Sequence, residues 1–225
     1  MLNELNKTEK QDAASAECGR GMLIVVSSPS GGGKGTLIDR VLQTVPGVSY
    51  SVSYTTRAPR GAEQDGREYF FVSTVTFEGL IRQGEYLEWA DVYGHLYGTS
   101  KAQVERERAA GKDIILEIDV QGAASIRELI DDAVSIFILP PSFELLRNRL
   151  AARGTDSPMD LERRLRGAPL EVEQYRYFQY VILNDDINRA SAQLASVIYA
   201  ERARRERQEI RLKETLADFA SLLES

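Results

Sequence analysis

The chain has 225 residues, of which 43% are hydrophobic, and its formal net charge is -6 at pH 7. This length fits one α/β domain or at most two small ones, and the negative charge argues against a nucleic-acid binder held by general positive charge. Cys18 is the only cysteine, which excludes an internal disulfide and a cysteine-rich metal site. No apolar run reaches the ~20 residues of a membrane helix. The polar stretch from Met1 to Glu17 lacks a secretory core, so we expect a cytoplasmic protein with a disordered tail over residues 1–20.

A glycine-rich run between two apolar segments is the most informative stretch. Residues 22–26 predict a buried strand, and residues 35–44 predict a helix. The run between them, SSPSGGGKGT, has the layout of a phosphate-binding loop, because glycines let backbone N–H groups turn inward around an anion and the helix N-terminus adds its positive dipole end. Lys34 adds a charge that can reach the outer phosphates. The residues expected to bind ATP here are Ser28, Pro29, Ser30, Gly31, Gly32, Gly33, Lys34, Gly35 and Thr36.

This run departs from the usual pattern G-x-x-x-x-G-K-[ST] at two positions. Ser28 stands at the first glycine, and Gly35 stands where a hydroxyl side chain normally holds magnesium. Thr36 follows one residue later. We therefore expect the metal to be held through water, with Thr36 acting on phosphate. A simple glycine turn does not explain why Lys34 directly follows three glycines at a helix start.

The rest of the chain alternates strands and helices. Further strands are predicted over residues 50–54, 68–72, 86–93, 96–97, 113–118, 135–139 and 180–183. Further helices are predicted over residues 74–84, 100–111, 121–130, 142–152, 159–178 with an interruption at 167–169, and 187 to about 223. Alternation of this kind predicts an α/β, three-layer P-loop fold with a central parallel sheet. The strand-rich interval 55–100 is expected to be an insertion on the sheet edge.

A polar loop, TTRAPRGAEQDGR, precedes the predicted strand at 68–72. Arg57 and Arg60 are three residues apart in it, on either side of Pro59, and two such arginines can form a rigid clamp for a second phosphate. Two solvated surface arginines fit the composition equally well. Loops carry function more often than the framework does.

Glu88 lies among apolar and aromatic neighbours in the segment YLEWA, so its carboxylate is expected to be either partnered or functional. One carboxylate can accept both N1–H and the exocyclic amine of guanine, whereas adenine presents a lone pair at N1. Such a site discriminates by ~10⁴ in comparable cases. Thr99 can donate to the guanine O6. An edge-strand residue in a salt bridge is the other interpretation of Glu88. His95, between two predicted strands, is expected to be a turn residue with no catalytic or metal role.

Taken together, these motifs resemble guanylate kinases. The likeness rests on SSPSGGGKGT, SVSYTTRAPRGAEQDGREYFF, YLEWADVYGHLYGTS, EIDVQG, RGTD followed by RR, and ILNDD, in this order from residue 21 to about 200. It implies a guanylate kinase-like domain over residues 21–205, with a GMP-binding insertion at about 55–100 and a helical lid at about 149–166. A C-terminal helical extension would occupy residues 206–225.

The resemblance also implies an activity and a set of site residues. The activity is ATP-dependent phosphorylation of GMP, and of dGMP, with Mg²⁺ and no tightly bound organic cofactor. The implied GMP-binding residues are Ser53, Arg57, Arg60, Tyr69, Glu88, Tyr97, Thr99 and Asp119. Asp119 also lies near the metal, and Asn184 lies near the adenine of ATP. The implied catalytic residues are Lys34, Arg57 and three lid arginines that close over the ATP phosphates, namely Arg149, Arg153 and Arg164.

Because the acceptor phosphate is already ionised at neutral pH, the expected catalysis rests on alignment and charge neutralisation without a general base. Two other classes stay open. One is a binding module that keeps the fold and binds a protein partner, and Mg-ATP binding would separate it from an enzyme. The other is a kinase for a different small acceptor. ATP and GMP are the expected partners, without nucleic acid or membrane, and the sequence leaves monomer and homo-oligomer undecided.

Overall fold

The structure is a computed structural model that describes residues 19–152, 158–209 and 212–222. Its strands are β1 (Leu23–Ser27), β2 (Val48–Tyr50), β3 (Tyr54–Thr55), β4 (Phe70–Phe71), β5 (Tyr86–Val92), β6 (His95–Ser100), β7 (Asp113–Glu117), β8 (Val134–Leu139) and β9 (Tyr180–Leu183). Its helices are α2 (Lys34–Thr44), α3 (Thr74–Gln83), α4 (Lys101–Ala109), α5 (Val120–Leu129), α6 (Phe143–Ala152), α7 (Pro158–Glu173), the 3₁₀ helix η1 (Gln174–Tyr177), α8 (Ile187–Arg202), α9 (Arg205–Gln208) and α10 (Lys213–Ser221).

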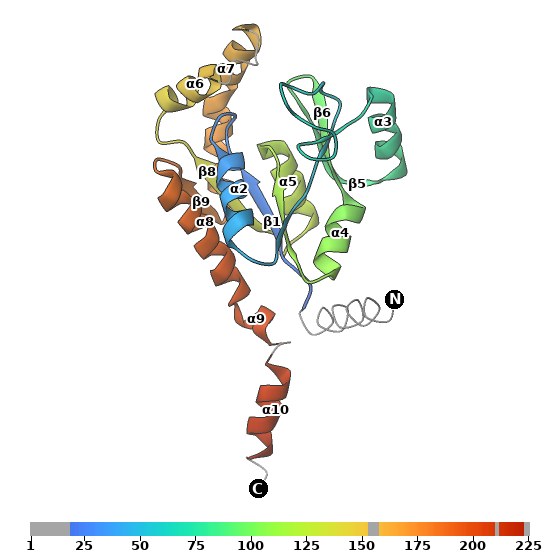
Figure 1. Ribbon diagram of the computed structural model, residues 1–225, viewed down its shortest axis with the longest axis vertical. Coiled ribbons are helices and arrows are strands. Elements are labelled where there is room, and N and C mark those ends of the chain that lie inside the picture. Colours follow the sequence, from blue (N-terminus) through green and yellow to red (C-terminus); the bar gives the residue numbers. More distant parts are fainter. Residues whose placement is uncertain (1–18, 153–157, 210–211, 223–225) are drawn as a thin grey trace.

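Five strands form a central parallel sheet in the order β2-β7-β1-β8-β9 (Figure 1). All five residues of β1 are buried, as expected of a strand whose two faces are both covered by helices. The β1 side chains alternate between those faces. Ile24 and Val26 pack with α2 and α8, while Leu23 and Val25 pack with α4 and α5. This arrangement confirms the predicted α/β fold with a central parallel sheet.

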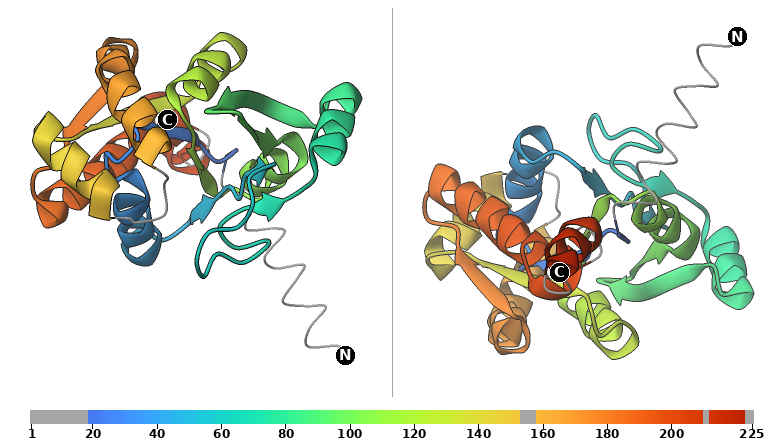
Figure 2. Two further views of the ribbon diagram at one scale, coloured as in Figure 1. Left: turned by 90° about the horizontal axis from the view of Figure 1, so that it is seen from above. Right: turned by 90° about the horizontal axis from the view of Figure 1, so that it is seen from below.

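The strand-rich interval forms a second sheet of its own, in the order β4-β3-β6-β5. The continuous strand predicted over residues 50–54 is wrong, because the chain passes between the two sheets within it. Ser51 still donates its N–H to Ile115 of the central sheet, whereas the Ser53 carbonyl accepts from Phe70 of the second sheet. The short link between these bonds separates β2 from β3. Seen from above in Figure 2, helices α6 and α7 and the second sheet lie on opposite sides of the central sheet.

Two helix predictions are also wrong. The interruption expected at residues 167–169 is absent, and α7 runs through Pro169. Ala168 is buried against Leu146 and Leu150 of α6, and this packing favours a continuous helix over the local breaking tendency of Gly and Pro. The helix expected from 187 to about 223 ends at Arg202, whose carbonyl accepts a hydrogen bond from the Gln208 side chain. Helices α9 and α10 follow it as separate elements.

No helix in the described part of the chain is long and apolar enough to cross a membrane. The division into a tail, a kinase-like domain and a C-terminal extension stays a prediction.

Candidate active site

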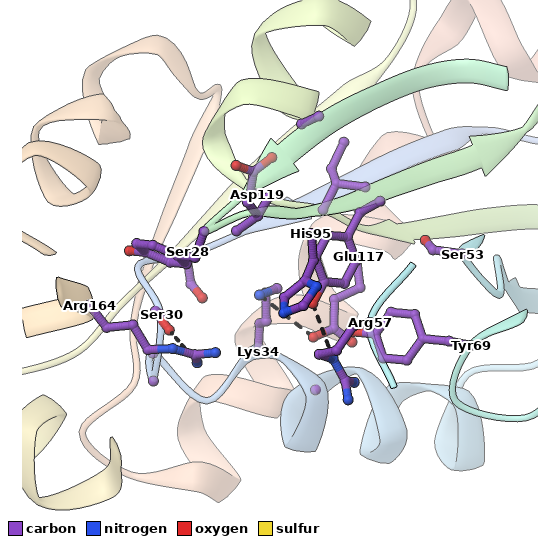
Figure 3. Close-up of a pocket in the computed structure, with 18 of the residues that line it drawn as sticks. Ser28, Ser30, Lys34, Ser53, Arg57, Tyr69, His95, Glu117, Asp119 and Arg164 are labelled. Carbon is purple, nitrogen blue, oxygen red and sulfur yellow. Dashed lines mark hydrogen bonds and ion pairs between the residues drawn. The ribbon is translucent and has the colours of Figure 1, made fainter. Parts of the chain in front are cut away.

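A cavity of about 450 Å³ lies where the carboxyl ends of β1 and β7 meet the second sheet and α7. Ligands in open α/β sheets bind at this edge. In Figure 3, Lys34 lies between Arg164 on one side and Arg57 on the other. The predicted residues that line the cavity are Ser28, Ser30, Gly31, Gly32, Gly33, Lys34, Gly35, Thr36, Ser53, Arg57, Arg60, Tyr69, Glu88, Tyr97, Asp119 and Arg164.

The glycine-rich run folds as a loop between β1 and α2. Gly33 is the N-cap of α2 with φ 88°, a conformation that favours glycine. A β-carbon at Gly33 would also lie 2.5 Å from Asn184 Nδ2. Lys34 begins α2, and its Nζ lies 3.7 Å from Glu117 Oε1. The loop therefore places a mobile cation and a helix N-terminus at one end of the cavity, an arrangement suited to phosphate.

Asn184 and Arg149 hold this loop from outside the cavity. Asn184 is buried, and its Nδ2 donates to the Gly32 carbonyl at 2.9 Å. Arg149 Nη1 donates to the same carbonyl at 3.2 Å, and its Nη2 donates to the Asn184 carbonyl at 3.2 Å. Pro29 is also buried, and its carbonyl accepts from the Gly32 N–H at 2.9 Å. The three residues thus fix the shape of the loop, and their contact with ATP stays a prediction.

Arg164 comes from α7 and donates from Nη1 to the Ser30 hydroxyl at 3.2 Å. One predicted cation of the lid therefore lies beside the phosphate loop. Arg153, the third predicted lid arginine besides Arg149 and Arg164, lies outside the described residues.

Arg57 is buried at the other end of the cavity, with 6% of its surface exposed. Its Nη1 and Nη2 donate to the two oxygens of Glu63 at 2.9 and 3.0 Å, and its Nε donates to the Tyr97 hydroxyl at 3.2 Å. The guanidinium also lies 5.3 Å from the centre of the Tyr69 ring. Burial raises the pKa of the Tyr69 hydroxyl above its ordinary value, with the charge of Glu117 adding to the shift. Tyr69 is therefore a hydrogen-bond donor at neutral pH, and the arginine is preorganised among groups suited to an anion.

Glu88 and Thr99 are paired across β5 and β6. The Thr99 hydroxyl donates to Glu88 Oε1 at 2.5 Å, and Thr99 has no exposed surface. Burial raises the pKa of Glu88 to about 7, Thr99 opposes this shift and the charge of Asp119 adds to it. No lysine or arginine of the described chain pairs with Glu88, which contradicts the salt-bridge interpretation. A buried carboxylate without a cationic partner is suited to a ligand that brings its own donors.

Asp119 is the N-cap of α5 at the end of β7. Its Oδ1 accepts from the Gly122 N–H at 2.9 Å, and its Oδ2 accepts from Gln121 Nε2 at 3.1 Å. Glu117, two residues earlier, pairs with Lys34 and accepts from the Tyr50 hydroxyl at 3.2 Å. Glu117 faces the phosphate loop through Lys34, and Asp119 lines the same cavity. No group of three metal-ligating side chains occurs among the described residues. Two carboxylates are typical of a site where Mg²⁺ takes most of its ligands from phosphates and water.

Three comparisons with known proteins agree on the family. The sequence model of the family described as Guanylate kinase matches residues 20–201. The chain belongs to the guanylate kinase family. It is 50% identical over 203 residues to guanylate kinase from Symbiobacterium thermophilum, covering 90% of this chain and 96% of that one, and 51% identical over 184 residues to the one from Aromatoleum aromaticum, covering 82% and 90%. The crystal structure of guanylate kinase from Anaplasma phagocytophilum matches with a TM-score of 0.70 at 34% identity, covering 86% of this chain and 96% of that one. The resemblance inferred from the motifs is therefore confirmed, as is the predicted enzyme class.

Several residues of this guanylate kinase site were missed by the sequence analysis. Those that also line the cavity are Asp39, Glu63, Tyr93, His95, Glu117, Asp160, Arg163 and Glu171. His95 was expected in a turn, but it is the first residue of β6 and follows the turn Tyr93-Gly94. The sequence positions of Glu63 and Glu117 could have indicated a place in the site, because Glu63 follows Arg60 in the polar loop and Glu117 ends a buried strand. For Tyr93 and Glu171, which are 78 residues apart, no local pattern marks the contact.

Proposed function

We propose that this chain transfers the γ-phosphoryl group of ATP to GMP, and to dGMP, in the cavity between the glycine loop and the second sheet. The observation that carries the proposal is Glu88, a buried carboxylate whose partner in the described chain is Thr99 rather than a cation. It belongs to the same cavity as an arginine fork and a phosphate loop with its lysine. Membership in a family of kinases that act on GMP supports the assignment.

The base-binding end favours guanine for a reason of hydrogen-bond chemistry. The two carboxylate oxygens of Glu88 accept from guanine N1–H and the exocyclic amine. Ser53 lines the cavity with them, while the buried Thr99 hydroxyl donates to Glu88 and holds the carboxylate in place. Adenine would place a lone pair against the carboxylate and leave a buried acceptor unpaired. The cost of an unpaired buried group, ~1–3 kcal/mol or more when charged, gives the discrimination.

The two phosphate-binding ends lie in one cavity, which suits direct transfer. The donor phosphates are assigned to Lys34 and to the backbone N–H groups of Gly31 and residues 33–36, because the N–H groups of Ser30 and Gly32 already donate to Glu171 and Pro29. The acceptor phosphate is assigned to Arg57, Arg60, Tyr69 and Tyr97. Because the acceptor is already ionised, the chain needs to align two anions, screen their repulsion and exclude water. Arg164, together with Arg149 and Arg153, is proposed to neutralise charge on the transferring group.

Magnesium fits this donor set in a restricted way. Gly35 offers no hydroxyl, and both oxygens of Asp119 already accept hydrogen bonds. A Mg²⁺ ion bound to the ATP phosphates would therefore be held by Asp119 and Glu117 largely through water, in keeping with its reluctance to dehydrate. When bound, the ion supplies charge neutralisation on the phosphate oxygens. No tightly bound organic cofactor belongs to the proposal.

The same proposal names nucleotides as the partners, without nucleic acid or membrane, and a cytoplasmic location. The net charge of -6 and the concentration of arginines inside one cavity support it. A role in guanine nucleotide synthesis and recycling follows from the reaction.

The test is turnover with GMP, dGMP, AMP and UMP side by side in a coupled assay for ADP. GMP and dGMP should be phosphorylated far faster than AMP and UMP, and Arg57→Ala should raise the KM for GMP while Mg-ATP binding is kept. Arg67→Ala is the matched control, because Arg67 is exposed in the same loop and pairs with Glu68. Equal rates with GMP and AMP would reject the role of Glu88 and Thr99.

A further inference from the structure

Tyr93 has a backbone conformation that is unfavourable for its residue type. Strands β5 and β6 are joined by the two-residue turn Tyr93-Gly94, with φ of 56° and 86°. Such turns favour Asn-Gly, because a bulky side chain is strained at positive φ. Tyr93 is the one non-glycine residue with positive φ in the described part of the chain. Strain beside a cavity is a reason to ask what the side chain does there.

The Tyr93 hydroxyl is one end of a bridge from the second sheet to the phosphate loop. It donates to Glu171 Oε1 at 2.8 Å, and Glu171 Oε2 accepts from the backbone N–H of Ser30 at 2.8 Å. Burial raises the pKa of the Tyr93 hydroxyl, with the charge of Glu171 adding to the shift. The hydroxyl therefore stays a donor at neutral pH. One carboxylate on α7 thus connects the two ends of the cavity.

The aromatic ring of Tyr93 also contacts two arginines of α7. The guanidiniums of Arg163 and Arg164 lie 5.4 and 5.6 Å from the ring centre, and such contacts contribute ~0.5–2 kcal/mol each. Arg163 Nη2 donates to the Tyr93 carbonyl at 3.0 Å, while Arg164 reaches the Ser30 hydroxyl. The ring therefore contacts both arginines, of which Arg164 reaches the phosphate loop and Arg163 lines the same cavity.

Gly167 makes room for this contact in the middle of α7. A β-carbon there would lie 3.1 Å from the Tyr93 hydroxyl oxygen, tighter than normal packing allows. A glycine inside a helix costs ~1 kcal/mol relative to alanine. Gly167, which had suggested a helix break, is explained instead by the close approach of Tyr93.

We infer that Tyr93 is a positioning residue for phosphoryl transfer, which sets α7 against the phosphate loop through Glu171 and orients Arg163 and Arg164 toward the phosphates. This inference rests on the proposed function, in which the acceptor binds on the second sheet and the donor on the loop. Because transfer depends on alignment of the two substrates, a bridge between their binding surfaces acts on the rate.

The decisive variant is Tyr93→Phe, which removes one oxygen and keeps the ring. Its kcat should fall ~10-fold, the effect of losing one hydrogen bond to a charged group. The Kd of GMP alone and of the β,γ-methylene analogue of ATP alone should not change. In the wild type, saturating analogue should lower the Kd of GMP. In Tyr93→Phe this decrease in Kd should be smaller. The inference would be overturned if Tyr93→Phe had the kcat of the wild type and the same decrease in the Kd of GMP on addition of the analogue.

A second variant protects the test against a general loss of structure. Gly167→Ala should move Tyr93 and reproduce the Tyr93→Phe phenotype. Gly79→Ala in α3 is its matched control, because a β-carbon there would meet Arg82 Nη2 only at 3.9 Å. Gly79→Ala should have the kcat of the wild type and the same decrease in the Kd of GMP on addition of the analogue. Identical behaviour of the two alanine variants would overturn the inference, whereas slow GMP turnover by the unmodified chain would overturn the proposed function instead.

Discussion

Glu63 binds the guanidinium of Arg57 end-on. Arg57 Nη1 donates to Glu63 Oε2 at 2.9 Å, and Nη2 donates to Oε1 at 3.0 Å. Its Oε2 also accepts from the backbone N–H of Arg60 at 2.8 Å. Burial by itself raises the pKa of Glu63, but the hydrogen bonds from Arg57 and Arg60 outweigh it and leave the pKa below its ordinary value. Glu63 is therefore ionised, and it fixes both predicted acceptor-phosphate arginines. On the other edge of Arg57, Nε donates to the Tyr97 hydroxyl at 3.2 Å, so a phosphate is expected to bind beside Nη2 and to compete with Tyr97 for the Nε–H.

Glu63→Gln should therefore weaken GMP binding, although it removes a negative charge from a phosphate site. We expect the KM for GMP to rise ~10-fold, about 1.4 kcal/mol, because the amide keeps only one acceptor oxygen. The kcat should change little, since the lost interaction acts on substrate and transition state alike. Steady-state kinetics with GMP at saturating Mg-ATP measures both values.

Glu68→Gln is the control for this charge change. Glu68 lies in the same loop and pairs with Arg67, away from Arg57, so its loss should leave the KM for GMP unchanged. A lower KM in Glu63→Gln would mean that the carboxylate competes with the phosphate instead of positioning the arginines.

Glu88→Gln should stabilise the protein and impair it as an enzyme. The folded-state pKa of about 7 lies above the ordinary value of 4.5. The stability contributed by the protonated group is therefore fully present below pH 4.5 and is lost as the pH rises through 7. Above pH 7 the buried charge costs on the order of 3 kcal/mol, and a neutral amide removes this cost.

Thermal unfolding at pH 5 and pH 8 measures this effect. The Tm of Glu88→Gln should exceed that of the wild type mainly at pH 8, while kcat/KM for GMP should fall ~100-fold because one guanine donor loses its acceptor. Glu85→Gln, exposed at the start of the same hairpin, should do neither. A destabilised Glu88→Gln at pH 8 would show that an ionised Glu88 stabilises the free enzyme.

Gly122→Ala should disturb guanine recognition from the adjacent helix. A β-carbon at Gly122 would lie 2.5 Å from Glu88 Oε2, so the carboxylate has to move. The usual gain from replacing a helical glycine by alanine, ~1 kcal/mol, should be offset by this displacement. We expect the ratio of kcat/KM for GMP over AMP to fall ~10-fold, which corresponds to about 1.4 kcal/mol of lost discrimination.

Gly79→Ala again serves as the control, since its added methyl group has space. It should stabilise α3 and leave the GMP to AMP ratio intact. An unchanged ratio in Gly122→Ala would show that Glu88 can rotate away without loss of guanine recognition.

Features whose residues lie close together in the chain could be predicted from the sequence. The phosphate loop is contiguous, so its glycines and Lys34 could be recognised from spacing and the flanking apolar segments. Arg57 and Arg60 lie in one loop, and the chain order of strands and helices was enough to predict the parallel sheet. The family resemblance added residues that no spacing indicates, such as Asn184.

Contacts between distant segments could not be predicted in this way. Glu171 meets Tyr93 and Ser30 only because α7 packs beside the hairpin turn and the phosphate loop. Gly167 looks like a helix breaker until the Tyr93 hydroxyl is placed beside it. Likewise, Gly122 follows Asp119 in an ordinary helix start, and its importance depends on how closely Glu88 approaches. Tertiary packing determined each of these outcomes against the local preference of the residue.

Gly35→Ser should restore a direct metal ligand to the phosphate loop. A β-carbon at residue 35 would lie 3.6 Å from each oxygen of Glu117, an ordinary contact, so the side chain fits without rearrangement. A serine hydroxyl there can replace one water of a Mg²⁺ ion bound to the nucleotide. Calorimetric titration of ADP at a series of Mg²⁺ concentrations should give a half-saturating Mg²⁺ several-fold lower than in the wild type. Gly35→Ala adds the same β-carbon without the oxygen and should leave the half-saturating Mg²⁺ concentration unchanged. An unchanged or higher half-saturating concentration in Gly35→Ser would show that the hydroxyl donates to Glu117 instead of binding the metal.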